Sequence, residues 1–210
     1  RIMRFFRFHA WYGKGAPDDD GMAACTQKVA LLKALSRERV WSELVKLFTA
    51  PKPMRAIEAF ERTGATAILK LGPLNSTDLA RYIKREQAVG FPPDPLLRLA
   101  CWLRLDTKAV AGFARRFRLS NKERDRLGAV SSALTAPCPA SLHELKVFIY
   151  SRGQGAAQCR LLVEPDAVPD DYITTLRTWQ VPALPVRGGD LVERGLEPGP
   201  AVSARLLELE

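Results

Sequence analysis

Residues 1–12, Arg1-Ile-Met-Arg-Phe-Phe-Arg-Phe-His-Ala-Trp-Tyr12, show the helical periodicity that recurs along the whole chain. On a helix of about 100° per residue, most of their apolar side chains gather on one broad face. That face holds Ile2, Phe5, Phe6, His9 and Ala10. A second face carries arginines one turn apart with aromatic rings among them, namely Arg1, Arg4, Arg7, Phe8 and Trp11. The segment therefore predicts an amphipathic helix at the start of the chain.

The basic and aromatic face of this helix allows two interpretations. Arginines pair with phosphates and aromatic rings stack on bases, so the face could contact a nucleic acid. Arginine stems also lie along aromatic rings when a helix is covered on two sides. On chemistry alone, packing is the more common use of such a face. We expect Phe8 and Trp11 to meet a neighbouring helix or another domain.

Helix-start signals precede most of the later apolar runs. The capping residues are Asp18, Ser36, Asn75, Asp94, Ser120 and Ser141. The triplet Asp18-Asp-Asp20 also raises the possibility of a metal site, but it lacks the alternating spacing of a calcium loop, which favours capping. No long stretch alternates at period two. The sequence predicts an all-α fold, a multi-helix array of about ten short or medium helices.

The breaks between helices are marked by proline and glycine. Residues 21–35 predict one continuous helix, whereas residues 65–74 predict a connector. Thr135-Ala-Pro-Cys-Pro139 is the clearest linker. Arg39 and Glu43, four residues apart on the predicted helix 37–49, predict an ion pair.

Composition points to a basic globular protein. The 210 residues contain 32 Lys+Arg against 23 Asp+Glu, a net charge of +9, which favours a polyanionic partner such as a nucleic acid. The four cysteines are far apart and form no Cys-x-x-Cys pair, and His9 and His143 are the only histidines, which argues against a structural zinc site. Arg98 and Arg104 interrupt the longest apolar run, and no signal peptide is visible, so we expect a cytoplasmic protein.

Motifs of a catalytic centre are missing from the sequence. It contains no phosphate-binding loop of the P-loop type, no Gly-x-Ser-x-Gly elbow and no paired carboxylates of the kind that hold two metal ions. We therefore assign no catalytic residue to this chain. The first residue is Arg1 and not methionine, so we expect the chain to be cut from a longer protein.

Three motifs in order resemble class II CCA-adding tRNA nucleotidyltransferases and their bacterial poly(A) polymerase relatives. Residues 1–8 are similar to the family's Arg-Ile-Leu-Arg-Ala-x-Arg-Phe segment. Leu35-Ser-Arg-Glu-Arg-Val-Trp-Ser-Glu-Leu-Val-Lys-Leu47 resembles Ser-x-Glu-Arg-Ile-x-x-Glu-Leu-x-Lys-Leu. Residues 184–200 resemble a tail motif, Pro-x-x-Gly-x-Asp-Leu followed by Gly-x-x-x-Gly-Pro. The resemblance implies the helical part of the family, with a neck (1–64), a body (65–136) and a tail (137–210).

The resemblance also implies roles for particular residues. In the family, a Glu-Asp-x-x-Arg motif faces the incoming nucleotide, and its last residue aligns with Arg1, which with Arg4 is expected to bind nucleotide. Glu38, Arg39 and Glu43 are expected to brace the neck. The expected RNA-binding side chains are Arg7, Arg115, Arg116, Arg118 and Lys122.

The same resemblance implies partners and a cofactor. The intact enzyme adds C, C and A to tRNA from CTP and ATP, with Mg²⁺ held by carboxylates of an N-terminal catalytic head. Nothing in this sequence matches that head, so this chain alone is expected to be inactive. Poly(A) synthesis, a split C- or A-adding activity, a free-standing helical RNA-binding module and a protein-interaction scaffold remain open alternatives.

Overall fold

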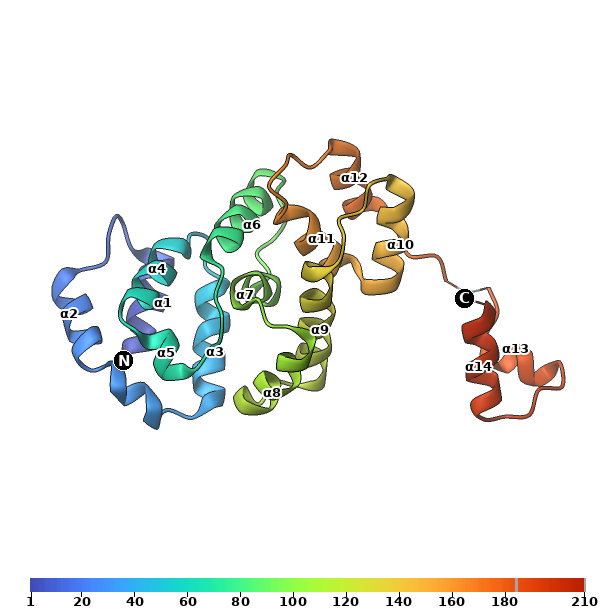
Figure 1. The fold of residues 1–210 in the computed structure, drawn as a ribbon, viewed down its shortest axis with the longest axis horizontal. Helices are drawn as coiled ribbons and strands as arrows, with labels where there is room; N and C mark the ends of the chain where they lie inside the picture. Colours follow the sequence, from blue (N-terminus) through green and yellow to red (C-terminus); the bar gives the residue numbers. More distant parts are fainter. Residues whose placement is uncertain (184, 210) are drawn as a thin grey trace. The chain divides into compact units, whose positions relative to one another are not determined.

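The computed structural model describes residues 1–183 and 185–209, which divide into two compact units, Arg1–Thr178 and Trp179–Glu210. The described residues form fourteen α-helices and one 3-10 helix and contain no strand, which confirms the all-α prediction (Figure 1). There are more helices than the roughly ten predicted, in part because the expected helix 21–35 is divided and the expected connector 65–74 contains a short helix. No helix among the described residues is long and apolar enough to cross a membrane.

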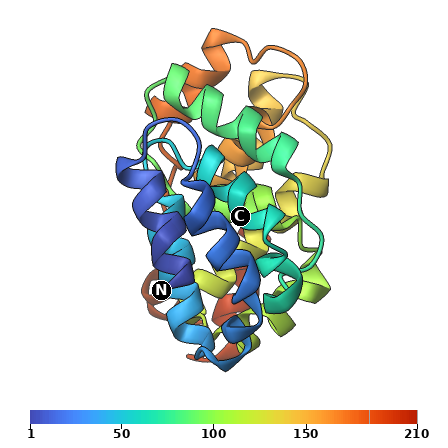
Figure 2. The same ribbon diagram turned by 90° about the vertical axis from the view of Figure 1, so that its left-hand side faces the viewer.

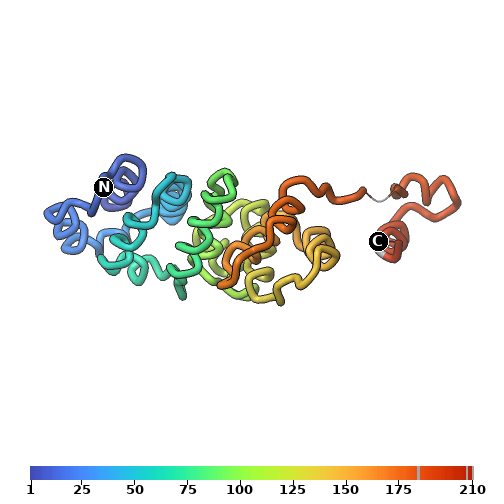
Figure 3. Tube along the Cα trace, turned by 90° about the horizontal axis from the view of Figure 1, so that it is seen from above, coloured from blue at the N-terminus to red at the C-terminus, as the bar shows by residue number. Residues whose placement is uncertain are grey.

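The first unit contains all but the last two helices. They are α1 (Ile2–Tyr12), α2 (Asp19–Gln27), η1 (Val29–Ala34), α3 (Arg37–Phe48), α4 (Met54–Arg62), α5 (Ala65–Leu69), α6 (Ser76–Ala88), α7 (Pro95–Leu103), α8 (Thr107–Phe117), α9 (Asn121–Thr135), α10 (Leu142–Arg152), α11 (Gln154–Leu162) and α12 (Asp170–Thr178). Within this unit, α1 to α5 lie at one end, α6 to α9 follow, and α10 to α12 lie at the other end (Figure 3). The predicted boundaries at residues 64 and 136 both fall inside this unit and stay predictions.

Two segments differ from the prediction. The expected helix over residues 21–35 is interrupted at Lys28, where the chain changes to the 3-10 helix η1, which packs beside α5 and buries Leu32. The expected connector 65–74 begins with the short helix α5. Gly64 adopts a left-handed conformation (φ 75°), which turns the chain after α4 and lets it re-enter a helix. The five residues of α5 are too few for helical periodicity to be recognised in the sequence.

Helix α1 packs against both α3 and α4, as the view from the N-terminal end shows (Figure 2). Met3, Phe6 and Ala10 are its buried residues. The ring of Phe6 meets Phe60 of α4 edge to face, with the centroids 5.3 Å apart. Met3 lies outside the predicted apolar face, and it is buried because two helices cover α1 instead of one.

A buried ion pair lies where α3, α6 and α7 meet. Arg98 and Glu86 are both fully buried and are joined by hydrogen bonds from two nitrogens of the guanidinium group. The third nitrogen of Arg98 donates to the carbonyl oxygens of Phe48 (2.8 Å), the last residue of α3, and of Ala50 (2.7 Å), two residues further on. Helix α7, which contains residues 96–103 of the apolar run, is therefore a core helix, and its Arg98 is satisfied by partners from two other segments.

The second unit is a pair of short helices, α13 (Gly188–Glu193) and α14 (Pro200–Leu209). A Cβ atom added at Gly188 would lie 3.1 Å from Cγ1 of Val202, so the absence of a side chain permits the close approach of the two helices. Residues 188–193 and Pro200 of the predicted tail motif lie in these helices. Leu184, the first residue of the matched stretch, and Glu210 lie outside the described residues.

Candidate nucleic-acid interface

A basic groove of about 370 Å³ lies between α1 and the segment from Leu35 through α3. Its basic lining residues are Arg1, Arg4, Arg39 and Lys46. Arg39 and Lys46 are seven residues apart, two helical turns, and therefore lie on one face of α3. All four cations are exposed. The predicted nucleotide-binding residues Arg1 and Arg4 thus share a groove with two further cations, which could surround a phosphate or a base edge.

One carboxylate, Glu43, lines the groove, and it is paired. Its Oε2 atom accepts a hydrogen bond from Nε of Arg7 at 2.7 Å, and its Oε1 atom lies 3.9 Å from the Lys46 ammonium group. The predicted partner of Glu43 was Arg39, but Arg7 holds Glu43 because α1 lies against that face of α3. The side chain of Arg7, which was predicted to bind RNA, is only 19% exposed, and its bond to Glu43 joins α1 to α3.

The aromatic side chains of α1 are partly used in the fold. The indole N–H of Trp11 donates to the carbonyl oxygen of Lys46 at 3.0 Å, so Trp11 does meet the neighbouring helix α3. Phe8 is 45% exposed, and the guanidinium groups of Arg4 and Arg7 lie 5.6 Å and 4.6 Å from its ring centroid. Phe8 therefore presents an aromatic face beside two cations at the protein surface.

A second basic surface, called the α8 ridge, is formed by Arg115, Arg116, Arg118 and Lys122. Arg115 and Lys122 are exposed, and neither is in an ion pair with the described part of the chain. Arg116 donates to the carbonyl oxygen of Lys70 at 2.6 Å, and its guanidinium group lies 5.2 Å from the Phe117 ring centroid. Partial burial, with a contribution from Arg37, lowers the pKa of Arg116 below its usual value.

The α8 ridge is tied to α3 by Arg118. Its guanidinium group bonds the Glu38 carboxylate at 2.6 Å. The pKa of Glu38 is lowered, first by a backbone hydrogen bond and further by Arg118. Glu38 and Glu43, both expected to brace the neck, thus hold α3 to α8 and to α1 respectively, and whether either has a further role stays a prediction.

A hydrogen bond beneath the ridge fixes α9 to α3. The indole N–H of Trp41 donates to Oε1 of Glu123 at 2.9 Å, and Ser120 at the N-cap of α9 bonds the other carboxylate oxygen at 2.7 Å. Burial would raise the pKa of Glu123, but the hydrogen bonds from Trp41 and Ser120 outweigh burial and lower it. The Trp41 ring also meets Phe113 of α8 edge to face at 6.0 Å. The packed rings of Trp41 and Phe113 therefore support α8, which carries most of the ridge.

Sequence reasoning missed two kinds of basic residue. It did not place Lys46 in the groove and gave Arg39 a bracing role only, although their seven-residue spacing on one helix was a usable signal. It also passed over Arg37, whose proximity to Arg116 comes from the packing of α3 against α8, and no local pattern reveals that contact.

Within residues 1–183 and 185–209, the acidic triplet Asp18–Asp20 begins a helix and does not form a magnesium site. Asp18 caps α2 by accepting from the backbone N–H of Gly21 at 2.7 Å, as the sequence predicted, and Asp19 and Asp20 occupy the first turn of that helix. No three His, Cys, Asp or Glu side chains of the described residues gather as ligands.

Comparisons with known proteins point to one family. A family model described as "Probable RNA and SrmB-binding site of polymerase A" matches residues 17–72, which include α2 to α5. The "CCA-adding enzyme" of Streptococcus gordonii is 28% identical over 218 residues, covering 100% of this chain and 54% of the relative. The mitochondrial "CCA tRNA nucleotidyltransferase 1" of Mus musculus is 25% identical over 223 residues, covering 100% of this chain and 50% of that protein.

A shorter match has higher identity. The "Multifunctional CCA protein" of Halorhodospira halophila is 40% identical over 73 residues, 33% of this chain and 18% of the relative. The chain spans about half the length of the first two relatives. The all-helical fold, the match to the polymerase A segment and the similarity of the whole chain to CCA-adding enzymes support a C-terminal part of the CCA-adding enzyme and poly(A) polymerase family.

Proposed function

We propose that this chain is the tRNA-binding helical part of a CCA-adding tRNA nucleotidyltransferase. The observation that carries the proposal is the match of the whole chain to CCA-adding enzymes from a bacterium and a mitochondrion. The whole enzyme would add C, C and A to the 3′ end of tRNA from CTP and ATP in the cytoplasm. Its Mg²⁺ would be held by carboxylates of an N-terminal catalytic head, a domain with no counterpart in these 210 residues.

The α1–α3 groove would face the incoming nucleotide. The Arg1 guanidinium would bond the Watson–Crick edge of the base, and Arg4 and Arg39 would attract its phosphates. Glu43 leaves those cations free because Arg7 already holds its carboxylate. The α8 ridge would contact the tRNA backbone, because exposed arginines read charge and shape more than sequence.

Binding of tRNA by the 210-residue chain tests this proposal. We expect fluorescence anisotropy to show an affinity that falls steeply with salt, because cations displace counterions from phosphates. The Arg4→Gln/Arg39→Gln variant should bind more weakly than the Arg62→Gln/Lys146→Gln variant, which removes the same charge from exposed positions outside the groove and the ridge. Equal affinity at low and high salt, or an equal loss in both variants, would contradict the proposal.

Two further measurements separate this function from its alternatives. An unlabelled tRNA without its CCA end should displace the labelled tRNA better than a poly(A) oligonucleotide of equal length does, and the reverse order would favour a poly(A) polymerase. We also expect no incorporation of CTP or ATP by the chain alone with Mg²⁺, since the catalytic carboxylates would come from the head. Incorporation by the purified chain would refute the assignment of catalysis to the head.

A further inference from the structure

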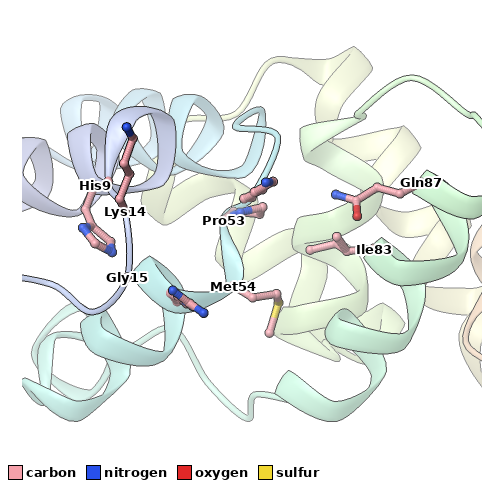
Figure 4. Close-up of a pocket in the computed structure, with 10 residues that line it drawn as sticks. His9, Lys14, Gly15, Pro53, Met54, Ile83 and Gln87 are labelled. Carbon is pink, nitrogen blue, oxygen red and sulfur yellow. The ribbon is translucent and has the colours of Figure 1, made fainter.

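A basic pocket that neither the groove nor the α8 ridge includes lies between α1, α4 and α6. Its volume is about 440 Å³. Figure 4 shows His9 and Lys14 on the α1 side of this pocket and Ile83 and Gln87 on the α6 side. None of its lining residues lines the α1–α3 groove. We call it the α1–α4–α6 pocket.

The lining of the pocket carries positive charge and no carboxylate. Lys14, Lys52 and Arg55 all contribute to it, and all three are exposed. None of them is in an ion pair with residues 1–183 or 185–209. Three cations around one small concavity repel one another, and an anion between them relieves that repulsion.

The loop that carries Lys14 is shaped by glycines on either side of it. A Cβ atom at Gly13 would lie 2.3 Å from Nδ1 of His9 and 2.6 Å from the His9 carbonyl oxygen, so only glycine lets the loop leave α1 this closely. Gly15 has a φ of 77°, which other L-residues rarely adopt. Lys14 is therefore held next to the end of α1 and does not lie on an extended tail.

The segment that carries Lys52 is fixed from the opposite side. The Gln87 amide of α6 donates to the carbonyl oxygen of Pro51 at 2.7 Å. Pro53 is buried at the N-cap of α4, and prolines on both sides of Lys52 restrict its backbone. Two unrelated loops are thus anchored by α1 and α6 so that their cations line the same pocket.

We propose that the α1–α4–α6 pocket binds a phosphate group. A phosphate suits the pocket because lysine and arginine are its usual protein ligands and because the Gln87 and His9 side chains add polar atoms to the lining. The phosphate could belong to an RNA backbone or to a free polyphosphate. The RNA source rests on the proposed function, whereas phosphate binding itself does not.

Nuclear magnetic resonance tests the site directly. The probe is pyrophosphate, titrated at constant ionic strength into the full chain, and the readouts are the backbone amide signals of Gly13 and Gly15. We expect both signals to shift saturably. The Lys14→Gln/Lys52→Gln/Arg55→Gln variant should raise the dissociation constant about tenfold or more, because three charges are removed from one small cavity.

The matched control is Lys33→Gln/Arg62→Gln/Lys146→Gln, which removes the same charge from exposed positions outside the pocket. It should bind pyrophosphate as the unmodified chain does, and the thermal midpoint of both variants should match that of the unmodified chain. Glycine signals that do not shift saturably would overturn the proposal. An equal loss of pyrophosphate affinity in the control and the pocket variant would also overturn it.

A second arm identifies the source of the phosphate. If the pocket variant loses more tRNA affinity than the control, the pocket holds a phosphate of the RNA backbone. If both variants bind tRNA equally while pyrophosphate binding is lost only in the pocket variant, the ligand is a free phosphate compound. Failure of all tRNA binding would contradict the proposed function and leave the pyrophosphate result as an independent measure of the pocket.

Discussion

The Arg7 guanidinium bonds the Glu43 carboxylate at 2.7 Å, although 36 residues separate them in the sequence. Each side chain is about one-fifth exposed, so the bond lies at the edge of the α1–α3 contact and not free in solvent. This pair gives Arg7 a role in joining α1 to α3, and its predicted contact with RNA stays a prediction. It also cancels the one negative charge in the lining of the α1–α3 groove.

Loss of this pair should affect stability more than RNA binding. We expect Arg7→Gln to lower the free energy of unfolding by about 1 kcal/mol, the usual contribution of a partly exposed charged hydrogen bond. Urea denaturation measures that loss. The control is Arg4→Gln, an exposed groove arginine that should leave stability unchanged and weaken RNA binding. A larger loss of tRNA affinity in Arg7→Gln than in Arg4→Gln would show that Arg7 contacts RNA after all.

The Glu123 carboxylate should make stability depend on acid pH. Its pKa is lowered in the fold from an ordinary value near 4.5, so the folded state favours the ionised form. Its stabilising contribution is present above that ordinary value and is lost as the pH falls through the folded-state pKa. We expect the thermal midpoint of Glu123→Gln to be lower at neutral pH and to fall less steeply between about pH 5 and pH 3. Glu58→Gln, at an exposed position of α4, is the control, and parallel pH profiles for the two variants would contradict the prediction.

Removal of Arg98 should be far more costly than removal of a surface arginine. Arg98→Met would leave the buried Glu86 carboxyl group without its partner, which typically costs about 3–5 kcal/mol. The double variant Arg98→Met/Glu86→Leu should recover part of the loss, because no unpaired buried carboxyl group remains. It should not reach the original stability, since the Phe48 and Ala50 carbonyl groups lose their donor. Urea denaturation distinguishes these cases, and a double variant no more stable than the single one would refute this account.

Helix caps could be predicted from the sequence, whereas contacts between helices could not. Asp18, Asn75 and Ser120 could be predicted as caps because each bonds a backbone N–H three residues ahead, within its own helix. Whether Arg98 points to solvent or to the core could not be predicted, because its partners come from α6 and from the end of α3.

The candidate site likewise contains residues that a local motif predicts and residues that only tertiary packing brings together. Arg1 and Arg4 were predicted from a local motif, and the structure places them in one groove. Their roles in nucleotide binding stay predictions. That Glu43 would bond Arg7 and not Arg39 depends on how closely α1 lies against α3, which helical periodicity alone does not determine. Lys14 and Lys52 line one pocket because of tertiary packing, and no sequence pattern links them.

Two neighbouring arginines of α8 should respond differently to substitution. Arg115→Gln is expected to weaken tRNA binding and to reduce the slope of log affinity against log salt by about 0.7–0.9, the loss of one phosphate contact. Arg116→Gln should also lower the thermal midpoint, because Arg116 bonds Lys70 and stacks on Phe117. Anisotropy titrations at several salt concentrations, with calorimetry, separate the two effects. An unchanged salt slope in Arg115→Gln would exclude Arg115 from the RNA contact.

Two glycines offer a paired test of the Lys14 loop. Gly13→Ala places a methyl group against the His9 carbonyl and ring, and we expect a loss of about 1–3 kcal/mol because the loop must move. Gly112→Ala meets no atom within 4 Å on α8 and should gain about 0.5–1 kcal/mol from better helix propensity. Thermal unfolding compares the two variants. Equal thermal midpoints would show that the loop can move without a loss of stability.

The buried Arg98 also affects which RNA molecules can contact both basic surfaces. It bonds the carbonyl groups at the end of α3 and the carboxylate of α6, so α3 cannot slide along α6 without breaking several bonds at once. Helix α3 carries one wall of the α1–α3 groove and, through Glu38, the anchor of the α8 ridge. We therefore expect the α1–α3 groove and the α8 ridge to keep a constant spacing. An RNA that touches both must present phosphates at that spacing, which a stiff duplex can do and a slack single strand does only at an entropic cost.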